Sequence, residues 1–150
     1  MRYRMLVLAL VAGACAKADD APVDSPATAA VVPATISLAD VAGKWMATAR
    51  PETGDTTVVN YEMTATADPS TWTITLPGRP VMPVNVRTDG DSIMVTNGPY
   101  ESVLRKGVQV STESVMRLVD GKLVGHTIAH YTTTAADSVV RLRVEATRAP

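Results

Sequence analysis

The sequence predicts an all-β domain, an eight-stranded antiparallel up-and-down barrel over residues 36–150. From Val41 onward the chain is rich in Val and Thr, and apolar and polar residues alternate with a period of two. Such alternation, interrupted at short intervals by turn residues, is typical of strands with one buried face. Consecutive antiparallel strands of this kind close into a barrel because closure removes the exposed sheet edges.

Each strand is bounded by a recognisable turn signal. Asp89-Gly90 and Asp120-Gly121 favour two-residue hairpin loops, in which glycine adopts a positive φ. A turn at Asp68-Pro69 and a four-residue loop at 134–137 join two further pairs of strands. The expected strands span about 42–50, 56–66, 70–77, 81–88, 91–97, 109–119, 122–132 and 138–147.

These turns set a register that can be checked. The expected cross-strand pairs are Met63 with Ile74, Val86 with Ile93, Leu118 with Leu123, Met116 with Gly125, Tyr131 with Val140, and Ala129 with Leu142. A slip of one residue would mix the apolar and polar faces. The resulting inner face comprises Trp45, Tyr61, Met63, Trp72, Ile74, Val84, Val95, Met116, Leu118, Tyr131, Leu142 and Val144. The tight turns lie at one end, which is expected to be closed, and the longer connections lie at the other, open end.

The N-terminus has the layout of an export signal. Arg2 and Arg4 precede an apolar run over residues 5–12, which is too short to span a bilayer as a helix. Cys15 follows and is the only cysteine, so no internal disulfide is possible. We predict a signal peptide over residues 1–14. Alternatively, Cys15 is removed with the signal, because Ala16-Lys17-Ala18 also fits a cleavage site.

The stretch Ala12-Gly13-Ala14-Cys15 resembles the lipobox of bacterial lipoproteins. The resemblance implies a lipid on Cys15 that attaches the protein to a membrane, and Ala16 after it implies the outer membrane. A soluble periplasmic or secreted protein is the alternative. Residues 15–35 are mostly Ala, Pro, Asp and Thr without apolar periodicity, which predicts a flexible tether with a span of roughly 25 Å.

Charge argues against nucleic acid as a partner. Of the 14 basic residues, Arg2 and Arg4 leave with the expected signal, so the remaining chain carries 12 basic and 15 acidic groups and a formal charge of −3. A mildly acidic chain without Lys/Arg clusters lacks the electrostatic footprint of a nucleic-acid-binding protein.

Enzyme motifs are absent, and we expect neither catalysis, nor a cofactor, nor a bound metal. The sequence contains no HExxH motif, glycine-rich phosphate loop or Asp-rich calcium loop. His126 and His130 are the only histidines. On a strand they would lie about 13 Å apart on the outer face, too far apart to share one ion.

Gly43-Lys44-Trp45, at the start of the first strand, resembles the G-x-W motif of lipocalins and related calycins. The resemblance implies a small up-and-down barrel in which Trp45 plugs the closed end. It also implies that an arginine from the last strand, here Arg148, packs across the indole by a cation–π contact. The segment 36–45 would then cover the base of the barrel.

The inner face suggests a binding site toward the open end. An eight-stranded barrel is just wide enough to be filled by side chains or to hold one small ligand, and several inward positions are Ala or Gly. We therefore expect the barrel to bind a small apolar or amphipathic molecule. The expected contact residues, with Tyr100 on the 97–107 connection, are Tyr61, Leu76, Met82, Val95, Tyr100 and Tyr131.

A second function class remains open. Some periplasmic calycin-like barrels inhibit proteases through an exposed segment, so residues 16–40 or the 97–107 connection would serve an envelope protein-interaction or protease-inhibitor module without a small-molecule ligand. An interior cavity above ~300 Å³ would favour the ligand hypothesis, and a filled core would favour the interaction module.

Overall fold

The computed structural model describes residues 35–53, 58–134 and 136–150. The expected signal peptide 1–14, Cys15 and all but the last residue of the 15–35 tether lie outside the described residues. The described part contains nine strands and one 3-10 turn, which are β1 (Gly43–Pro51), β2 (Val59–Ala65), η1 (Pro69–Thr71), β3 (Thr73–Thr75), β4 (Met82–Pro83), β5 (Asn85–Asp89), β6 (Ser92–Glu101), β7 (Gln109–Val119), β8 (Lys122–Tyr131) and β9 (Val139–Arg148).

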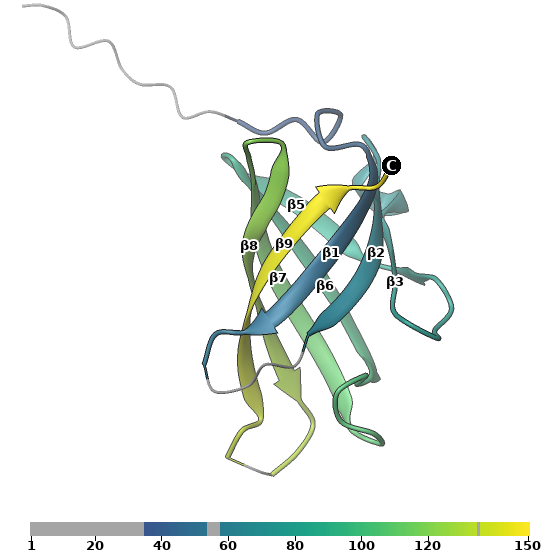
Figure 1. Cartoon of the computed structure of the whole chain (residues 1–150), viewed down its shortest axis with the longest axis vertical. Helices are drawn as coiled ribbons and strands as arrows, with labels where there is room; N and C mark the ends of the chain where they lie inside the picture. The colour runs from purple at the N-terminus through teal and green to yellow at the C-terminus, as the bar shows by residue number, and fades with distance from the viewer. Residues whose placement is uncertain (1–34, 54–57, 135) are drawn as a thin grey trace, which may run out of the picture. The chain divides into compact units, whose positions relative to one another are not determined.

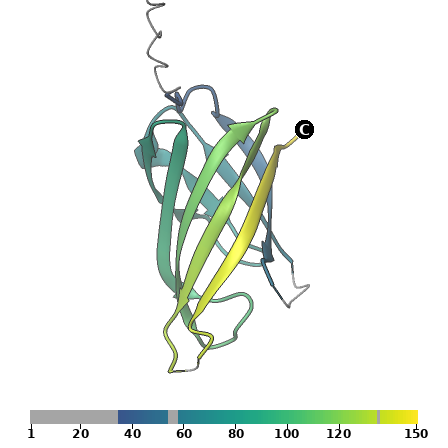
Figure 2. The same cartoon turned by 90° about the vertical axis from the view of Figure 1, so that its left-hand side faces the viewer.

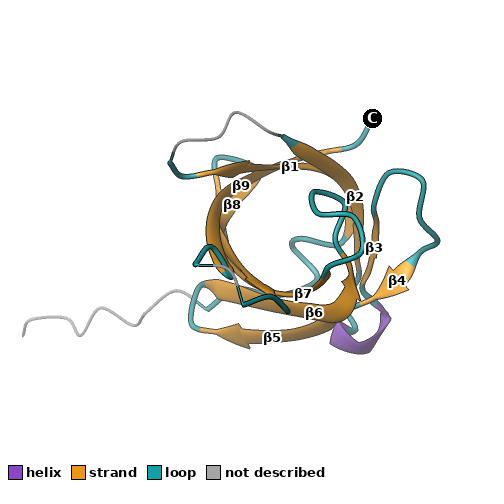
Figure 3. Cartoon of the chain, turned by 90° about the horizontal axis from the view of Figure 1, so that it is seen from below, coloured by secondary structure: helices purple, strands orange, loops and turns teal. Residues whose placement is uncertain are grey.

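The strands form one antiparallel up-and-down sheet that curls into a nearly closed barrel (Figures 1 and 2). Their order is β4-β3-β2-β1-β9-β8-β7-β6-β5, so the first long strand pairs with both β2 and the last strand, β9. The two ends of the sheet, β4 and β5, are consecutive in the chain and separated only by Val84. The covalent chain therefore completes the ring seen end-on in Figure 3.

The barrel has nine strands, and the expectation of eight was wrong. The segment expected as one strand at 81–88 is divided at Val84: β4 pairs with β3, and β5 pairs with β6. Asp68 caps the 3-10 turn η1 by accepting from Ser70 N–H at 2.9 Å, which shortens β3 to three residues. Between β4 and β5, the Val84 N–H donates to the Trp72 carbonyl oxygen at 3.1 Å.

The β7–β8 hairpin confirms the predicted register. Leu118 pairs with Leu123, and Met116 pairs with Gly125. Both residues of the Asp120-Gly121 loop have positive φ, at 50° and 77°. This backbone twist matches that of the flanking strands, which is why Asp-Gly suits a two-residue hairpin. The expected pairing of Met63 with Ile74 is also confirmed.

Two other hairpins differ from the prediction by two residues. In the β5–β6 hairpin the loop is Gly90-Asp91, so Val86 pairs with Val95 instead of Ile93. Gly90 has a φ of 57°, and its carbonyl accepts from the Ile36 N–H at 2.9 Å. Glycine at the first of the two loop positions is typical of the type II′ turn, one of the two common turns in two-residue hairpins.

The β8–β9 connection is longer than the four residues expected. Ala129 pairs with Val140, and Thr127 pairs with Leu142. The Thr132 N–H donates to the Gln109 carbonyl of β7 at 2.8 Å. The chain beyond Tyr131 therefore stays beside β7, and β9 begins only at Val139.

Strand β6 also runs further than predicted. It continues to Glu101, past the expected end at residue 97, because Gly98-Pro99 forms a bulge. Asn97 pairs with Thr112 and Tyr100 with Val110, so β6 contains one residue more than β7 between these pairs. Gly98 has a φ of 109°, and a Cβ there would lie 2.7 Å from the Val110 carbonyl oxygen. Only glycine fits such a close approach of two backbones.

The closed end is built around Trp45. Its indole is fully buried, and Nε1–H donates to the Val41 carbonyl oxygen at 2.8 Å. The Arg148 guanidinium lies over the ring, with Cζ 4.5 Å from its centroid, and donates to the carbonyls of Ala42 and Asp40, each at 2.7 Å. The expected Trp–Arg contact is therefore present. Gly43 beside it has a φ of 140°, a conformation that other residues rarely adopt, and a Cβ there would lie 2.7 Å from Arg148 Nη1.

Every residue expected on the inner face belongs to the core or packs against it. Most are buried, and Tyr61 and Leu118 are partly buried against the same cluster. The small inward residues Ala47, Ala49 and Ala146 are buried as well. The alternation of the sequence thus identifies the inner face correctly, even where the exact register differs.

Candidate functional site

The barrel interior contains a cavity of about 70 Å³ toward the open end. Five of the six expected contact residues line it: Tyr61, Leu76, Val95, Tyr100 and Tyr131. Tyr61 lies on β2 and Leu76 directly follows β3. Val95 and Tyr100 lie on β6, and Tyr131 lies on β8, so the fold brings together side chains that are distant in sequence.

Met82 is the exception among the expected contact residues. It lies on the two-residue strand β4, pairs with Ile74, and packs against the core without lining the cavity. The expected fourth strand is divided at Val84. Met82 therefore lies on the short strand β4, which pairs with β3 at one end of the sheet.

One wall of the cavity is polar, which the sequence interpretation missed. Thr112 and Ser114 point inward from β7, and Thr127 points inward from β8. The hydroxyls of Ser114 and Thr127 share a hydrogen bond of 2.7 Å. Strict alternation would have predicted these positions, since Thr112 and Ser114 share the parity of Met116 on β7, and Thr127 shares that of Ala129 on β8. They were overlooked because only apolar residues were assigned to the inner face.

Asn97 is the most unusual polar group in this wall. It lines the cavity immediately before the Gly98-Pro99 bulge. Its Nδ2 atom is buried and has no hydrogen-bond partner among the described residues. Buried polar side chains are nearly always satisfied, so an unpartnered amide donor requires an explanation.

The two tyrosines at the cavity are held in their neutral form. Burial raises the pKa of Tyr61 far above its ordinary value of 10.0, and the neighbouring Tyr100 raises it further. Burial also raises the pKa of Tyr100, although a hydrogen bond with the Thr112 side chain acts in the opposite direction. Both phenols are therefore available to donate and accept hydrogen bonds across the physiological pH range.

A short loop over residues 102–108, which joins β6 to β7, folds over the mouth of the cavity. Val103 and Leu104 from this loop line the cavity. Ser102 organises the loop: its N–H donates to the Val108 carbonyl at 2.8 Å, and its hydroxyl accepts from the Leu104 and Arg105 N–H groups at 3.0 Å. The loop is thus a defined structural unit.

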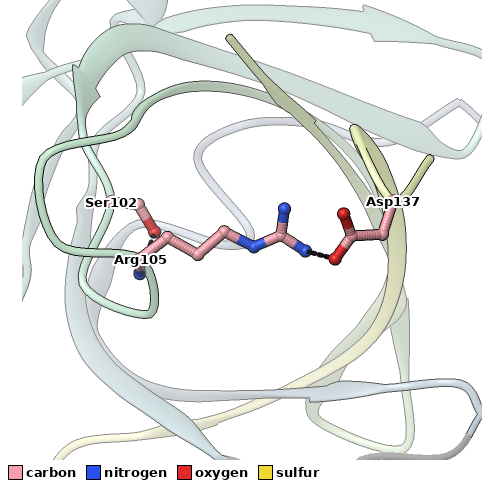
Figure 4. Close-up of polar contacts among 3 residues, drawn as sticks. All are labelled: Ser102, Arg105 and Asp137. Atoms are coloured by element: carbon pink, nitrogen blue, oxygen red, sulfur yellow. Dashed lines mark hydrogen bonds and ion pairs between the residues drawn. The ribbon is translucent and has the colours of Figure 1, made fainter. Parts of the chain in front are cut away.

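Arg105 fastens this loop to the opposite side of the mouth. As Figure 4 shows, its side chain extends to Asp137 on the β8–β9 connection, where Nη2 and Oδ2 are 2.5 Å apart. The guanidinium also lies over the Tyr131 ring, with Cζ 4.0 Å from the centroid. The Asp137 side chain is 65% exposed. The Arg105 side chain is 26% exposed, and a partly exposed ion pair of this kind contributes about 0–1 kcal/mol.

The buried Tyr61 phenol predicts a loss of stability at alkaline pH. In the unfolded chain Tyr61 ionises near its ordinary pKa of 10.0, whereas in the folded barrel it stays neutral to higher pH. Ionisation therefore lowers the free energy of the unfolded state above about pH 10, and stability falls as pH rises, by up to ~1.4 kcal/mol per pH unit for one such group. Urea unfolding between about pH 8 and pH 11 should show this slope, and Tyr61→Phe should reduce it. Equal slopes in the two proteins would contradict the assignment.

The remaining candidate groups lie outside the barrel interior or are not assembled. His126 pairs with Val115 and Arg143 on the outer face, as expected, and His130 is exposed. Within residues 35–53, 58–134 and 136–150, no group of three His, Cys, Asp or Glu side chains is arranged to hold a metal ion. No helix in this part of the chain is long and apolar enough to cross a membrane.

Comparison of the chain with protein-family profiles, with curated proteins and with solved structures finds no match.

Proposed function

We propose that this protein is a lipid-anchored envelope protein whose calycin-like barrel binds one small apolar or amphipathic molecule at its open end. The lipobox-like Cys15 and the Trp45–Arg148 arrangement of the closed end support the anchor and the family likeness, respectively. The observation that carries the binding proposal is the cavity itself. Five expected contact residues and an unpartnered Asn97 amide converge on it beneath a lightly fastened loop.

The cavity volume sets a condition on this proposal. At about 70 Å³ it is smaller than the ~300 Å³ of typical ligand pockets, and smaller than the ~150 Å³ cavity that holds a benzene molecule. A ligand must therefore displace Val103 and Leu104, which requires the 102–108 loop to move outward. The ion pair between Arg105 and Asp137 and the contact of Arg105 with the Tyr131 ring would have to break as well.

Ala129→Leu tests the proposal directly. Ala129 is buried and lines the cavity, so a leucine there would fill the space that the ligand needs. We expect saturable one-to-one binding of a neutral fluorescent amphiphile to the wild-type protein, and affinity at least about tenfold lower in the variant. Fluorescence titration and native mass spectrometry would measure both.

Ala39→Leu is the matched control, because Ala39 is exposed on the segment before β1 and lies away from the cavity. It should bind as the wild type does. The absence of saturable binding to the wild type across a panel of chain lengths would refute the proposal, as would equal affinities of the two leucine variants.

The small volume favours a second candidate, an envelope protein-interaction or protease-inhibitor module. In that case the filled barrel is a scaffold, and the 102–108 loop is the contact surface, with Val103 39% exposed. Pull-down from an envelope extract separates the two proposals. A stoichiometric protein partner that is lost on deletion of residues 103–106, with no amphiphile binding, would favour the interaction module.

A further inference from the structure

The Asn97 amide is held in position by the backbone around it. Asn97 pairs with Thr112 on β7, and the next residue, Gly98, lies so close to β7 that a Cβ would be 2.7 Å from the Val110 carbonyl oxygen. This close approach places Asn97 directly beside β7. The donor stays buried beside the cavity without a partner among the described residues.

The side chains that line the cavity around this donor include polar groups but no charged ones. None of the described residues that line the cavity is Asp, Glu, Lys, Arg or His. The hydroxyls of Ser114 and Thr127 already bond to each other. Arg105, at the mouth, is paired with Asp137 and lies against Tyr131. A buried charge without a counter-charge is strongly disfavoured, whereas a neutral acceptor would satisfy the free donor.

We infer that the barrel selects an uncharged amphipathic ligand that carries a hydrogen-bond acceptor, such as a ketone, ester or amide carbonyl, and that Asn97 Nδ2 donates to this acceptor. This inference rests on the proposed function, since it names the chemistry of the ligand in the same cavity. The apolar part of the ligand would lie among Leu76, Val95 and the alkyl side chains of the 102–108 loop. Carboxylates of the same chain length are disfavoured because they would enter the cavity charged.

Three compounds of equal chain length test the inference: a methyl ketone, an alkane and a carboxylate at neutral pH. Each would compete with a neutral fluorescent probe bound to the full chain. We expect the ketone to bind about tenfold more tightly than the alkane, and the carboxylate to bind more weakly than the ketone. In Asn97→Leu, which replaces the amide by an apolar group of similar size, the ketone should lose about tenfold and the alkane should lose nothing.

Asn60→Leu is the control, because Asn60 lies on β2 and its side chain accepts from the exposed Thr48 hydroxyl outside the cavity. If Asn97→Leu fails to fold, Asn97→Ala removes the same donor without adding bulk or charge and should abolish the preference for the ketone over the alkane. Unchanged ketone affinity in a folded Asn97 variant, or tighter binding of the carboxylate, would overturn the inference. If the wild type binds neither the probe nor any compound, the proposed function itself fails.

Discussion

Trp45→Ala is expected to destabilise the barrel by about 4 kcal/mol. The indole is fully buried, so its removal leaves a large void at the closed end. The substitution also leaves the Val41 carbonyl without its Nε1–H donor and removes the ring beneath the Arg148 guanidinium. A loss of this size is a large share of the 5–15 kcal/mol that stabilises a typical domain. Urea unfolding followed by circular dichroism measures it independently of tryptophan fluorescence.

Two variants separate the contributions at this end. Trp45→Phe keeps most of the apolar volume and loses the N–H donor, so a loss of only about 1–2 kcal/mol is expected. Arg148→Met keeps an apolar stem but removes the cation–π contact and the donors to the Ala42 and Asp40 carbonyls, for which we also expect about 1–2 kcal/mol. A Trp45→Ala loss no larger than that of Trp45→Phe would show that the indole does not plug the barrel.

Gly125→Ala is expected to cost about 3 kcal/mol, although it adds only one methyl group. Gly125 pairs with Met116 at a point where the backbones of β7 and β8 come close together. A Cβ there would collide with the Val115 carbonyl oxygen and would lie 2.8 Å from Met116 Cα. Both are backbone atoms in the middle of a strand, so no side-chain rotation relieves the contact. The two strands would have to separate, and their hydrogen bonds would weaken.

Gly78→Ala is the matched control for the Gly125 substitution. Gly78 has a φ of 69°, and no atom lies within 4 Å of a Cβ built there. An alanine at this position adopts the left-handed conformation at a cost of about 1 kcal/mol and meets no steric conflict. Chemical unfolding of both variants should therefore show the larger loss for Gly125→Ala. If Gly78→Ala is the more destabilising of the two, the packing of β7 against β8 is looser than the structure indicates.

The effects expected at the two ends of the barrel are different in kind. The closed end is a packed unit, in which Trp45, Arg148 and Gly43 fit one another closely. The open end combines a small cavity, an unpartnered amide and a loop fastened by an exposed ion pair. Substitutions at the closed end should therefore change stability, whereas substitutions such as Asn97→Leu and Ala129→Leu should mainly change binding.

The sequence by itself determined which apolar residues face the interior and how the long strands follow one another as antiparallel neighbours. Alternation with a period of two assigned Met63, Met116 and Leu142 correctly to the core. The Asp120-Gly121 loop was predicted with its full register, because both residues readily adopt the positive φ that a tight hairpin requires. The contact between Trp45 and Arg148 was also anticipated, from the family resemblance and the position of each residue at the end of its strand.

Only the tertiary structure decided the register of the β5–β6 and β8–β9 hairpins. A shift of two residues leaves every side chain on the same face, so the hydrophobic pattern cannot distinguish Val86–Val95 from Val86–Ile93. Contacts from distant segments select between them. The Ile36 N–H bonds the Gly90 carbonyl, and Arg117 on β7 pairs with Asp91 at 3.1 Å. In the same way, the bond from Thr132 to Gln109 delays the start of β9.

The interior volume and the unpartnered Asn97 amide were likewise beyond the sequence. Both depend on how the 102–108 loop folds over the mouth and on the bulge at Gly98-Pro99, which lets β6 continue to Glu101. Local propensities report which backbone angles a residue tolerates and which face it prefers. They do not report the distances between strands and loops that are far apart in the chain, and those distances set the size and polarity of the cavity.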